Sequence, residues 1–235
     1  MKTLSKILLV TLIITLLPNC KPKAKLTKIS KEEYYSSVYA EMPQKILFAH
    51  AENLSTTEKA NMFYDVSIGK EIINKGYYAL PYSIMNYLTV DANKINVNDR
   101  SLKNLQSIGD LLQIDAILYA KIKEWKKHYY VVDGYITVVI EFELVSVKTG
   151  NTLWATNFTY YADLNPTSYY YVSTSCYDLI AYMIIDIVVT GVNTIFPPVV
   201  NIANNTNNSA LLLFPSGMYH PRYQVDKTDL INIPK

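Results

Sequence analysis

The sequence has few of the residues that build metal, cofactor and disulfide sites. It contains two cysteines, three histidines and seven glycines among 235 residues. No CxxC pair or Cys/His cluster indicates a metal site, and the histidines do not form a zinc-binding HExxH motif. There is no GxSxG nucleophile motif and no glycine-rich loop that could hold a phosphate. We therefore expect a protein without metal or cofactor, and most simply not an enzyme.

The chain also lacks an excess of charge of either sign. The formal net charge is +2, and two of the lysines, Lys2 and Lys6, lie in the first nineteen residues, so the remainder is neutral. Proteins that bind nucleic acid usually carry a concentrated basic patch. The composition therefore argues against a nucleic-acid partner.

No apolar run is long enough to span a bilayer, which needs about 20 residues. The uncharged run Ile7–Leu17 instead fits the core of a secretory signal, and Lys2 and Lys6 precede it. The alternative is a buried N-terminal helix, but the sharp change to polar sequence at Lys21 argues against it. We predict that residues 1–19 are a signal peptide.

Cys20 directly follows this segment. Residues 16–20, Leu-Leu-Pro-Asn-Cys, resemble a bacterial lipobox, in which the cysteine receives the lipid and becomes the mature N-terminus. The sequence departs from the usual pattern because Asn19, rather than a small residue, precedes the cysteine. Ordinary cleavage and an uncleaved anchor are the alternatives. Lipidation of Cys20, with palmitate among the acyl chains, would hold the protein almost permanently on a membrane, and Lys21 favours the outer membrane.

Residues 20–40 are predicted to be a lysine-rich tether that leads to one domain, residues 41–235. The lysines of the tether could attract anionic headgroups, or the segment could be a solvated linker. Cys176 is then the only other thiol, so the fold has no intrachain disulfide. It is most simply a small buried residue.

A strand–helix–strand unit is predicted between residues 45 and 80. Residues 45–49 form a short apolar strand, and Ser55 and Glu58 have the spacing of a capping box at the start of a helix. Lys75-Gly76 is a matching stop signal before a strand at residues 77–80. The predicted buried stripe of this helix consists of Met62, Val66, Gly69 and Ile73, widened by Phe63 and Ile72.

A second helix, capped by Asn98 or Asp99, leads into a sheet meander. Its apolar face consists of Leu102, Leu105, Ile108 and Leu112. A long strand from Ile114 is followed by the hairpin signal Asp133-Gly134. The next strand, residues 136–147, alternates apolar residues with Thr137, Glu141 and Glu143. A turn at residues 148–151 returns the chain into a third strand, residues 152–161.

The rest of the chain is predicted to contain one long helix and little regular structure. Residues 176–196 read as a buried apolar helix. An Asn-rich loop is predicted at residues 201–209, a short strand at residues 211–214, and an irregular tail after Pro215. The expected fold class is α/β (α+β): a mixed sheet with an antiparallel meander and three main helices packed on it.

Several motifs together resemble one protein family. They are residues 108–119 with Ile122 and Trp125 in the following strand, the Lys-Thr-Gly-Asn-Thr-Leu-Trp turn at residues 148–154, and Leu-Phe-Pro-Ser-Gly-Met-Tyr-His-Pro at residues 213–221. The chain resembles, over about residues 40–223, a lipoprotein family of unknown function that includes a neisserial surface antigen. It departs from the family pattern at Ile114, where Gly is common, and at Met218, where Pro is common.

The resemblance implies a domain similar to the N-terminal domain of TolB. The same architecture occurs in the curli secretion-channel lipoprotein and in lipoprotein activators of penicillin-binding proteins. It further implies an accessory role in an envelope assembly, with a curli-channel-like lipoprotein as a candidate partner and homo-oligomers as a further candidate. The expected location is the periplasmic side of the outer membrane.

Three functions are compatible with the sequence. The first is a non-enzymatic structural or assembly accessory of the cell envelope, in which Pro215, Gly217, His220 and Pro221 form an interaction or structural element. The second is a periplasmic ligand-binding protein or hydrolase, with His50, His128 or His220 in a cleft. The third is a pore component, which we disfavour because the predicted amphipathic strands all belong to the domain sheet.

Overall fold

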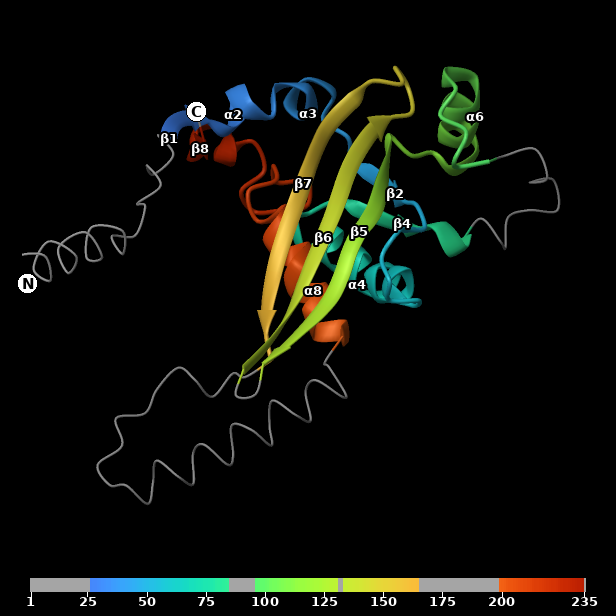
Figure 1. Ribbon diagram of the computed structural model, residues 1–235. Coiled ribbons are helices and arrows are strands. Elements are labelled where there is room, and N and C mark those ends of the chain that lie inside the picture. Colours follow the sequence, from blue (N-terminus) through green and yellow to red (C-terminus); the bar gives the residue numbers. More distant parts are fainter. Residues whose placement is uncertain (1–25, 85–95, 131–132, 165–198, 235) are drawn as a thin grey trace, which may run out of the picture. The chain divides into compact units, whose positions relative to one another are not determined.

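The computed structural model describes residues 26–84, 96–130, 133–164 and 199–234 (Figure 1). The chain divides into two compact units. In the smaller unit, β1 (Leu26–Ser30) and β8 (Leu230–Pro234) pair as a two-stranded sheet. The larger unit comprises residues 30–229. None of the helices in the described ranges is long and apolar enough to cross a membrane.

The larger unit is built on a mixed sheet in the order β4-β2-β5-β6-β7, with β3 also paired to β5. Strand β2 (Lys45–Phe48) runs parallel to β4 (Tyr78–Pro81) and to β5 (Ala116–Tyr130). The short β3 (Glu52–Asn53) is also parallel to β5. A parallel pair needs a crossover connection, and α4 (Ala60–Asn74) supplies it between β2 and β4. The predicted strand–helix–strand unit is confirmed.

An antiparallel meander completes the sheet, as predicted. Strand β5 pairs with β6 (Asp133–Ser146), and β6 pairs with β7 (Thr152–Asp163). Asp133 and Gly134 lie inside β6, opposite Tyr130 and Tyr129, and not in a turn as the sequence predicted. The turn at residues 147–151 is where the sequence placed it, with Gly150 at φ 73°.

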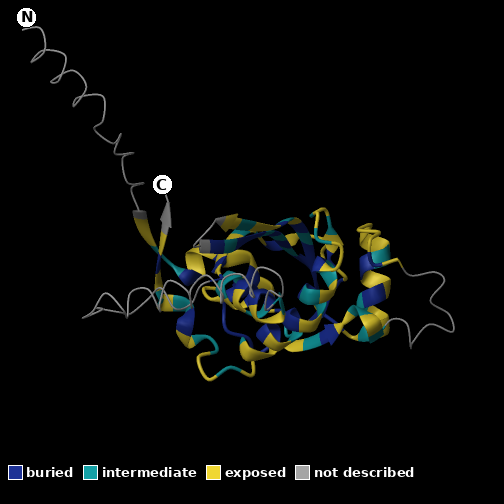
Figure 2. Cartoon of the chain, turned by 60° about the horizontal axis from the view of Figure 1, so that its bottom comes forward, coloured by how far each residue is buried: buried dark blue, intermediate teal, exposed yellow. Residues whose placement is uncertain are grey.

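Two helices cover one face of the sheet, which we call the inner face. Helices α4 and α8 (Val199–Leu211) lie side by side behind β5, β6 and β7 in Figure 1. The even-numbered residues of β6, from Ile136 to Leu144, point into this layer and are at most 1% exposed. Figure 2 shows the buried residues gathered between the sheet and these helices. Apolar burial on this face is the main stabilising contribution to the fold.

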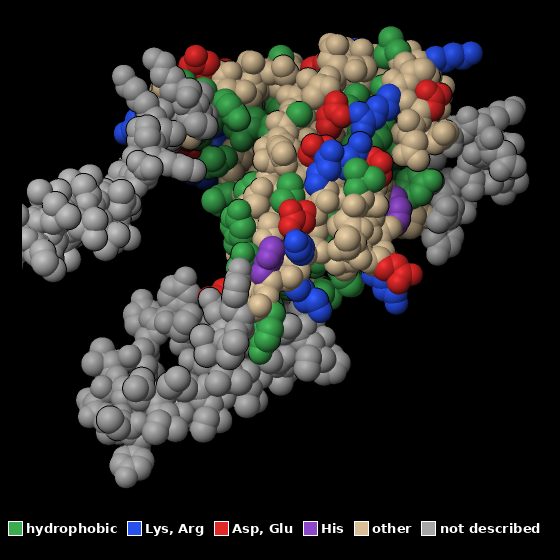
Figure 3. Space-filling view, viewed as in Figure 1, with side chains coloured by type: hydrophobic (Ala, Val, Ile, Leu, Met, Phe, Trp, Pro, Cys, Tyr) green, Lys and Arg blue, Asp and Glu red, His purple; other side chains and the backbone are tan. Residues whose placement is uncertain are grey.

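The opposite face, the outer face, is apolar at one end and polar over the rest. Helix α6 (Leu102–Leu112) places Leu105 and Ile108, both fully buried, against Ile117 and Val145. Beyond α6 no described helix covers the outer face, which carries polar and charged side chains (Figure 3). Because one face of β6 packs on the helices and the other is polar, Thr137, Glu141 and Glu143 alternate with apolar residues in the sequence.

Helix α4 buries only part of the predicted stripe, since Ile72 is buried but three other apolar members are exposed. Met62, Val66 and Ile73 are 55%, 69% and 60% exposed, while Tyr64 and Ile68 are fully buried. Packing on the sheet determines which face of α4 is buried, because Tyr64 packs on Phe142 of β6 with ring centroids 6.2 Å apart. The helix also packs closely on β2 here, because a Cβ at Gly69 would lie 3.1 Å from the Phe48 ring.

The predicted helix caps also differ. Helix α4 begins after Lys59, without a side-chain cap, and the Ser55 hydroxyl accepts a hydrogen bond from the Thr57 amide instead of that of Glu58. Helix α6 begins after Ser101, whose amide donates to the Asp99 carboxylate. Both signals therefore mark the turn that precedes each helix, where such side chains bond to backbone amides two residues on.

The Asn-rich segment forms a helix, and the predicted loop at residues 201–209 is wrong. Ile202, Ala203 and Leu211 of α8 are buried, and the Asn207 amide donates to the Ser67 hydroxyl of α4 at 2.7 Å. Tertiary packing thus overrides the weak helix preference of asparagine. The predicted strand at residues 211–214 is also wrong, since Leu211 ends α8 and a turn follows. The helix predicted at residues 176–196 lies outside the described residues.

Residues 31–41 are folded, in contrast to the predicted tether of residues 20–40. They form α2 (Lys31–Tyr34) and α3 (Ser36–Glu41). Tyr35, Val38 and Tyr39 are buried, at 6%, 2% and 8% exposure. The larger unit therefore begins near residue 30 and not at residue 41, because these apolar side chains complete its core.

Candidate functional site

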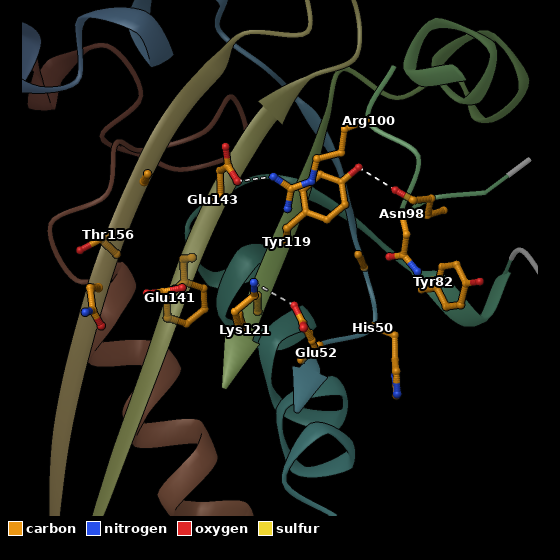
Figure 4. Close-up of a pocket in the computed structure, with 17 residues that line it drawn as sticks. His50, Glu52, Tyr82, Asn98, Arg100, Tyr119, Lys121, Glu141, Glu143 and Thr156 are labelled. Atoms are coloured by element: carbon orange, nitrogen blue, oxygen red, sulfur yellow. Dashed lines mark hydrogen bonds and ion pairs between the residues drawn. The ribbon is translucent and has the colours of Figure 1, made fainter. Parts of the chain in front are cut away.

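An open groove lies on the outer face of the sheet, over β5, β6 and β7. Its volume is about 1110 Å³. The residues between β2 and β3 form one wall, and residues 97–100, before α6, form another (Figure 4). The polar residues that line it are His50, Glu52, Tyr82, Asn98, Arg100, Tyr119, Lys121, Glu141, Glu143, Thr156 and Asn157.

Arg100 and Glu143 form the centre of the groove. The Arg100 guanidinium donates to Glu143 at 2.5 Å and lies 4.1 Å from the centre of the Tyr119 ring. The Thr152 hydroxyl donates to the other carboxylate oxygen of Glu143 at 2.7 Å. Partial burial alone would raise the pKa of Glu143, but the hydrogen bonds from Thr152 and Arg100 and the Arg100 charge outweigh it and lower this pKa. Glu143 is therefore an anion held in place, not a proton donor.

Tyr119 is fixed from both ends. Its hydroxyl donates to the Val97 carbonyl at 2.8 Å, while Arg100 covers the ring. Burial raises the pKa of Tyr119 to about 12, although the nearby Arg100 charge opposes the shift. The phenol therefore stays neutral and serves to position Arg100 and the residues before α6.

Two further ion pairs continue along the same face. Lys121 of β5 lies 3.0 Å from Glu52 of β3, and Lys123 lies 3.2 Å from Glu141 of β6. Cross-strand register explains the second contact, because Glu141 is opposite Lys121, next to the irregularity between Ile122 and Glu124. The outer face thus presents positive and negative side chains in alternation, and each carboxylate of these ion pairs has a cation beside it.

His50 is the histidine that lines the groove. Its Nδ1 contacts the Asp65 carboxylate, and its Nε2 lies 2.6 Å from the Asn61 amide nitrogen. Burial raises the pKa of Asp65, and the contact with His50 partly offsets that effect. Because both ring nitrogens of His50 have partners on α4, the imidazole is held in one orientation at the edge of the groove.

The other two histidines lie elsewhere. His128 of β5 stacks on Tyr135 of β6, with ring centroids 4.5 Å apart. His220 lies against Gly76, where a Cβ would collide with the His220 backbone, and its Nδ1 accepts a hydrogen bond from the Arg222 amide. The structure therefore does not bring the three histidines together. Within the described ranges, no group of three or more metal-binding side chains occurs.

The C-terminal element of Pro215, Gly217, His220 and Pro221 packs on the turn between α4 and β4. The Gly217 amide donates to the Lys75 carbonyl at 2.7 Å, and the Tyr77 hydroxyl donates to the Pro215 carbonyl at 3.0 Å. A Cβ at Gly217 would collide with the Gly76 backbone. Pro221 follows His220 in the turn that leads to Arg222. None of its four residues lines the groove, and Cys20 lies outside the described residues.

Sequence reasoning missed most of the groove. It noted that Thr137, Glu141 and Glu143 share one face of a strand, which is the signal that could have located it. Arg100, Tyr119 and Lys121 gave no such signal. The contacts of Arg100 with Tyr119 and of Lys121 with Glu52 depend on how α6 and β3 approach β5. Chemically the groove offers fixed donors, acceptors and an aromatic ring, which suits binding better than acid–base catalysis.

Comparison with known proteins identifies the family. A family model described as "Putative lipoprotein GNA1162-like" matches residues 33–220. No curated protein matches the sequence. Among solved structures, lipoprotein GNA1162 from Neisseria meningitidis is 18% identical with a TM-score of 0.44, over 62% of this chain and 98% of that one.

Two other solved structures are similar at lower identity. A PelC dodecamer from Paraburkholderia phytofirmans has 12% identity and a TM-score of 0.44, over 81% of this chain and 98% of that one. The LpoB C-terminal domain from Salmonella enterica has 11% identity and a TM-score of 0.37, over 56% and 95%. Because the family model covers most of the sequence, this chain belongs to the GNA1162-like lipoprotein family.

Proposed function

We propose that the protein is a lipid-anchored accessory of the cell envelope that acts by binding a protein partner and not by catalysis. The observation that carries this proposal is the outer-face groove with its fixed, mutually compensated charges. Membership of a lipoprotein family supports a place in the envelope. The signal segment and Cys20 support export and acylation, and the periplasmic side of the outer membrane is the proposed location.

The groove suits a protein surface because its charges alternate over a broad, open area. Two cations of the groove, Arg100 and Lys121, each lie beside a carboxylate, and Lys123 pairs with the groove residue Glu141. Such a surface steers and orients a partner of complementary pattern more than it concentrates one kind of small ion. A curli-channel-like lipoprotein, which the family resemblance implies, is the first partner to test.

The anchor is tested by labelling cells with a clickable fatty acid. We expect the wild-type chain to take up label and Cys20→Ala to take up none, because the thiol at residue 20 is the acceptor. Membrane fractionation supplies a second readout, with Cys176→Ser as the matched control that should behave as wild type. An unlabelled wild-type chain would remove lipidation from the proposal.

The partner surface is tested by photo-crosslinking in intact envelopes. A benzoylphenylalanine residue in place of Glu52, at the groove, should give an adduct heavier than the chain and different in mass from twice the chain. The same residue in place of Lys70, which is 66% exposed on α4, is the matched control and should not give this adduct. Equal adducts from both positions, or none from Glu52, would count against the groove as the partner site.

A second candidate function is a periplasmic ligand-binding protein or hydrolase. The observation that favours it is His50, which lines the groove and contacts Asp65. Against a hydrolase stands the Asn61 amide at Nε2, the nitrogen that a general base would use. If the purified chain cleaved chromogenic ester or amide substrates and His50→Gln abolished cleavage, the hydrolase would replace the accessory role.

A further inference from the structure

The two edges of the main sheet differ in how far they are protected. Strand β4, at one edge, has four residues and ends at Pro81. Strand β7, at the other edge, has twelve residues, no proline and no lysine, and its one charged residue is the last, Asp163. Natural sheets usually shield exposed edges with short strands, prolines or charges, because a free edge pairs with other strands.

The hydrogen-bond register shows which groups of β7 are unpaired. The Leu164 amide donates to the Gly134 carbonyl at 2.8 Å, which makes these residues a hydrogen-bonded pair of the β6–β7 ladder. Such pairs alternate along antiparallel strands. The backbone groups of Ala155, Asn157, Thr159 and Tyr161 therefore point away from β6.

Among the described residues, nothing outside β6 pairs with these backbone groups. In residues 26–84, 96–130, 133–164 and 199–234, no hydrogen bond reaches the amides or carbonyls of Ala155, Asn157, Thr159 or Tyr161 from outside β6. The four residues are all exposed, and Tyr161 is 67% exposed. The strand forms the outermost edge of the sheet in Figure 1. Between Ala155 and Tyr161 the edge therefore offers backbone donors and acceptors that an added strand could use.

We propose that the edge of β7 pairs with β7 of a second copy of this chain, antiparallel, about a two-fold axis near Thr159. This register places Asn157 opposite Tyr161, and it places Phe158 of one copy opposite Tyr160 of the other. Phe158 and Tyr160 are half-buried on the inner face, so the pairing adds aromatic contacts across the axis. The two sheets become one continuous sheet.

The charge pattern selects a second copy over a charged partner strand. Residues 152–162 are neutral, so self-pairing brings no like charges together, whereas a strand rich in lysine or glutamate would find no opposite charge on β7. Two-fold pairing of identical surfaces is also the commonest way in which protein subunits associate. The proposal does not depend on lipidation of Cys20 or on the groove partner.

Disulfide trapping tests the register. In the full chain in detergent, with Cys176→Ser as the background, Thr159→Cys should form a covalent dimer on mild oxidation. Residues that face each other as a hydrogen-bonded pair have Cα atoms about 5.5 Å apart, within the range of disulfides. Ser107→Cys, exposed on α6, is the matched control and should stay monomeric. Equal trapping at both positions, or none at Thr159→Cys, overturns the proposal.

Charge pairing at the axis provides a second test that does not depend on oxidation. Light scattering should show a dimer for the wild type and Thr159→Val, and monomers for Thr159→Lys alone and Thr159→Glu alone. An equal mixture of the two charged variants should restore the dimer, because opposite charges then meet at the axis. We expect the dissociation constant of each charged variant to rise about tenfold or more.

Each remaining outcome decides against the proposal. A wild-type monomer, or a dimer that Thr159→Lys leaves intact, would show that β7 is not the interface. If Thr159→Cys in membranes is trapped only with a different protein, that protein and not a second copy occupies the edge. Circular dichroism of each variant should match the wild type, and a charged variant that fails this check is replaced by Thr159→Arg or Thr159→Asp, which keep the charge at the axis.

Discussion

Substitution of Asp226 by Asn should lower the free energy of unfolding by about 3–5 kcal/mol, the usual cost of removing one partner from a buried ion pair. Asp226 is 1% exposed, and Lys31 of α2 donates to it at 3.2 Å. The Ser216 amide and the Tyr39 hydroxyl also donate to this carboxylate. The substitution leaves the Lys31 ammonium buried without a counter-charge.

Urea denaturation followed by tryptophan fluorescence measures this loss. The matched control is Arg222→Ala, because its exposed pair with Asp229 should contribute no more than about 1 kcal/mol. In the double variant with Lys31→Met, the loss should be smaller than the sum of the two single losses, since no charge is then left unpaired. Strict additivity of the two losses would contradict the proposed pairing.

The same carboxylate gives a pH dependence with a definite sign. Burial by itself would raise the pKa of Asp226, but the hydrogen bonds from Ser216 and Lys31 and the Lys31 charge together lower it. Because this pKa is lower in the folded than in the unfolded chain, the pair stabilises the fold above the unfolded pKa, near 4. This contribution is lost as the pH falls through the folded pKa. Asp226→Asn should remove this part of the acid dependence.

Substitution of Phe214 by Ala should cost about 3–5 kcal/mol of stability, as for other buried Phe→Ala changes. Phe214 is 4% exposed, and its ring meets the rings of Tyr35, Tyr77 and Trp154 at centroid distances of 5.9, 5.7 and 4.9 Å. These partners lie between α2 and α3, directly before β4, and in the edge strand β7. The cavity therefore loosens three segments that are distant in the sequence.

Equilibrium denaturation again supplies the measurement, and Trp154 fluorescence should also shift, because Trp154 loses a packed ring. Tyr219→Ala, at an aromatic position that is 64% exposed, is the matched control and should change stability by at most about 0.5 kcal/mol. A Phe214→Leu variant should lie between the two. A loss for Phe214→Ala no larger than that of the control would show that this cluster does not hold the C-terminal segment.

Local sequence determined the elements that have strong local signals. The meander follows from alternation, from Gly150 in its turn and from the apolar strand that starts near Ile114. The strand–helix–strand unit follows from an apolar strand, a helical period and the stop at Lys75-Gly76. These signals act between neighbours, so the mixed sheet and the family could be predicted without a structure.

The tertiary structure decided which faces are buried. The apolar stripe of Met62, Val66 and Ile73 has the period of a buried face, yet the sheet binds the side of α4 that carries Tyr64 and Ile68. The Asn-rich segment became α8 because Ile202 and Asn207 find partners on α4 and the sheet. Helical period and residue propensity are weak constraints beside the burial of a whole face.

The candidate site was decided almost entirely by tertiary structure. The sequence alone placed Glu141 and Glu143 on one face of a strand, and it predicts a signal segment that ends before Cys20. It could not bring Arg100 onto Tyr119 or Glu52 beside Lys121, because those contacts join segments many residues apart. Strand register, set by the burial of the alternate side chains, puts Glu141 and Glu143 on the outer face, and the approach of α6 and β3 to β5 brings Arg100 to Glu143 and Glu52 to Lys121.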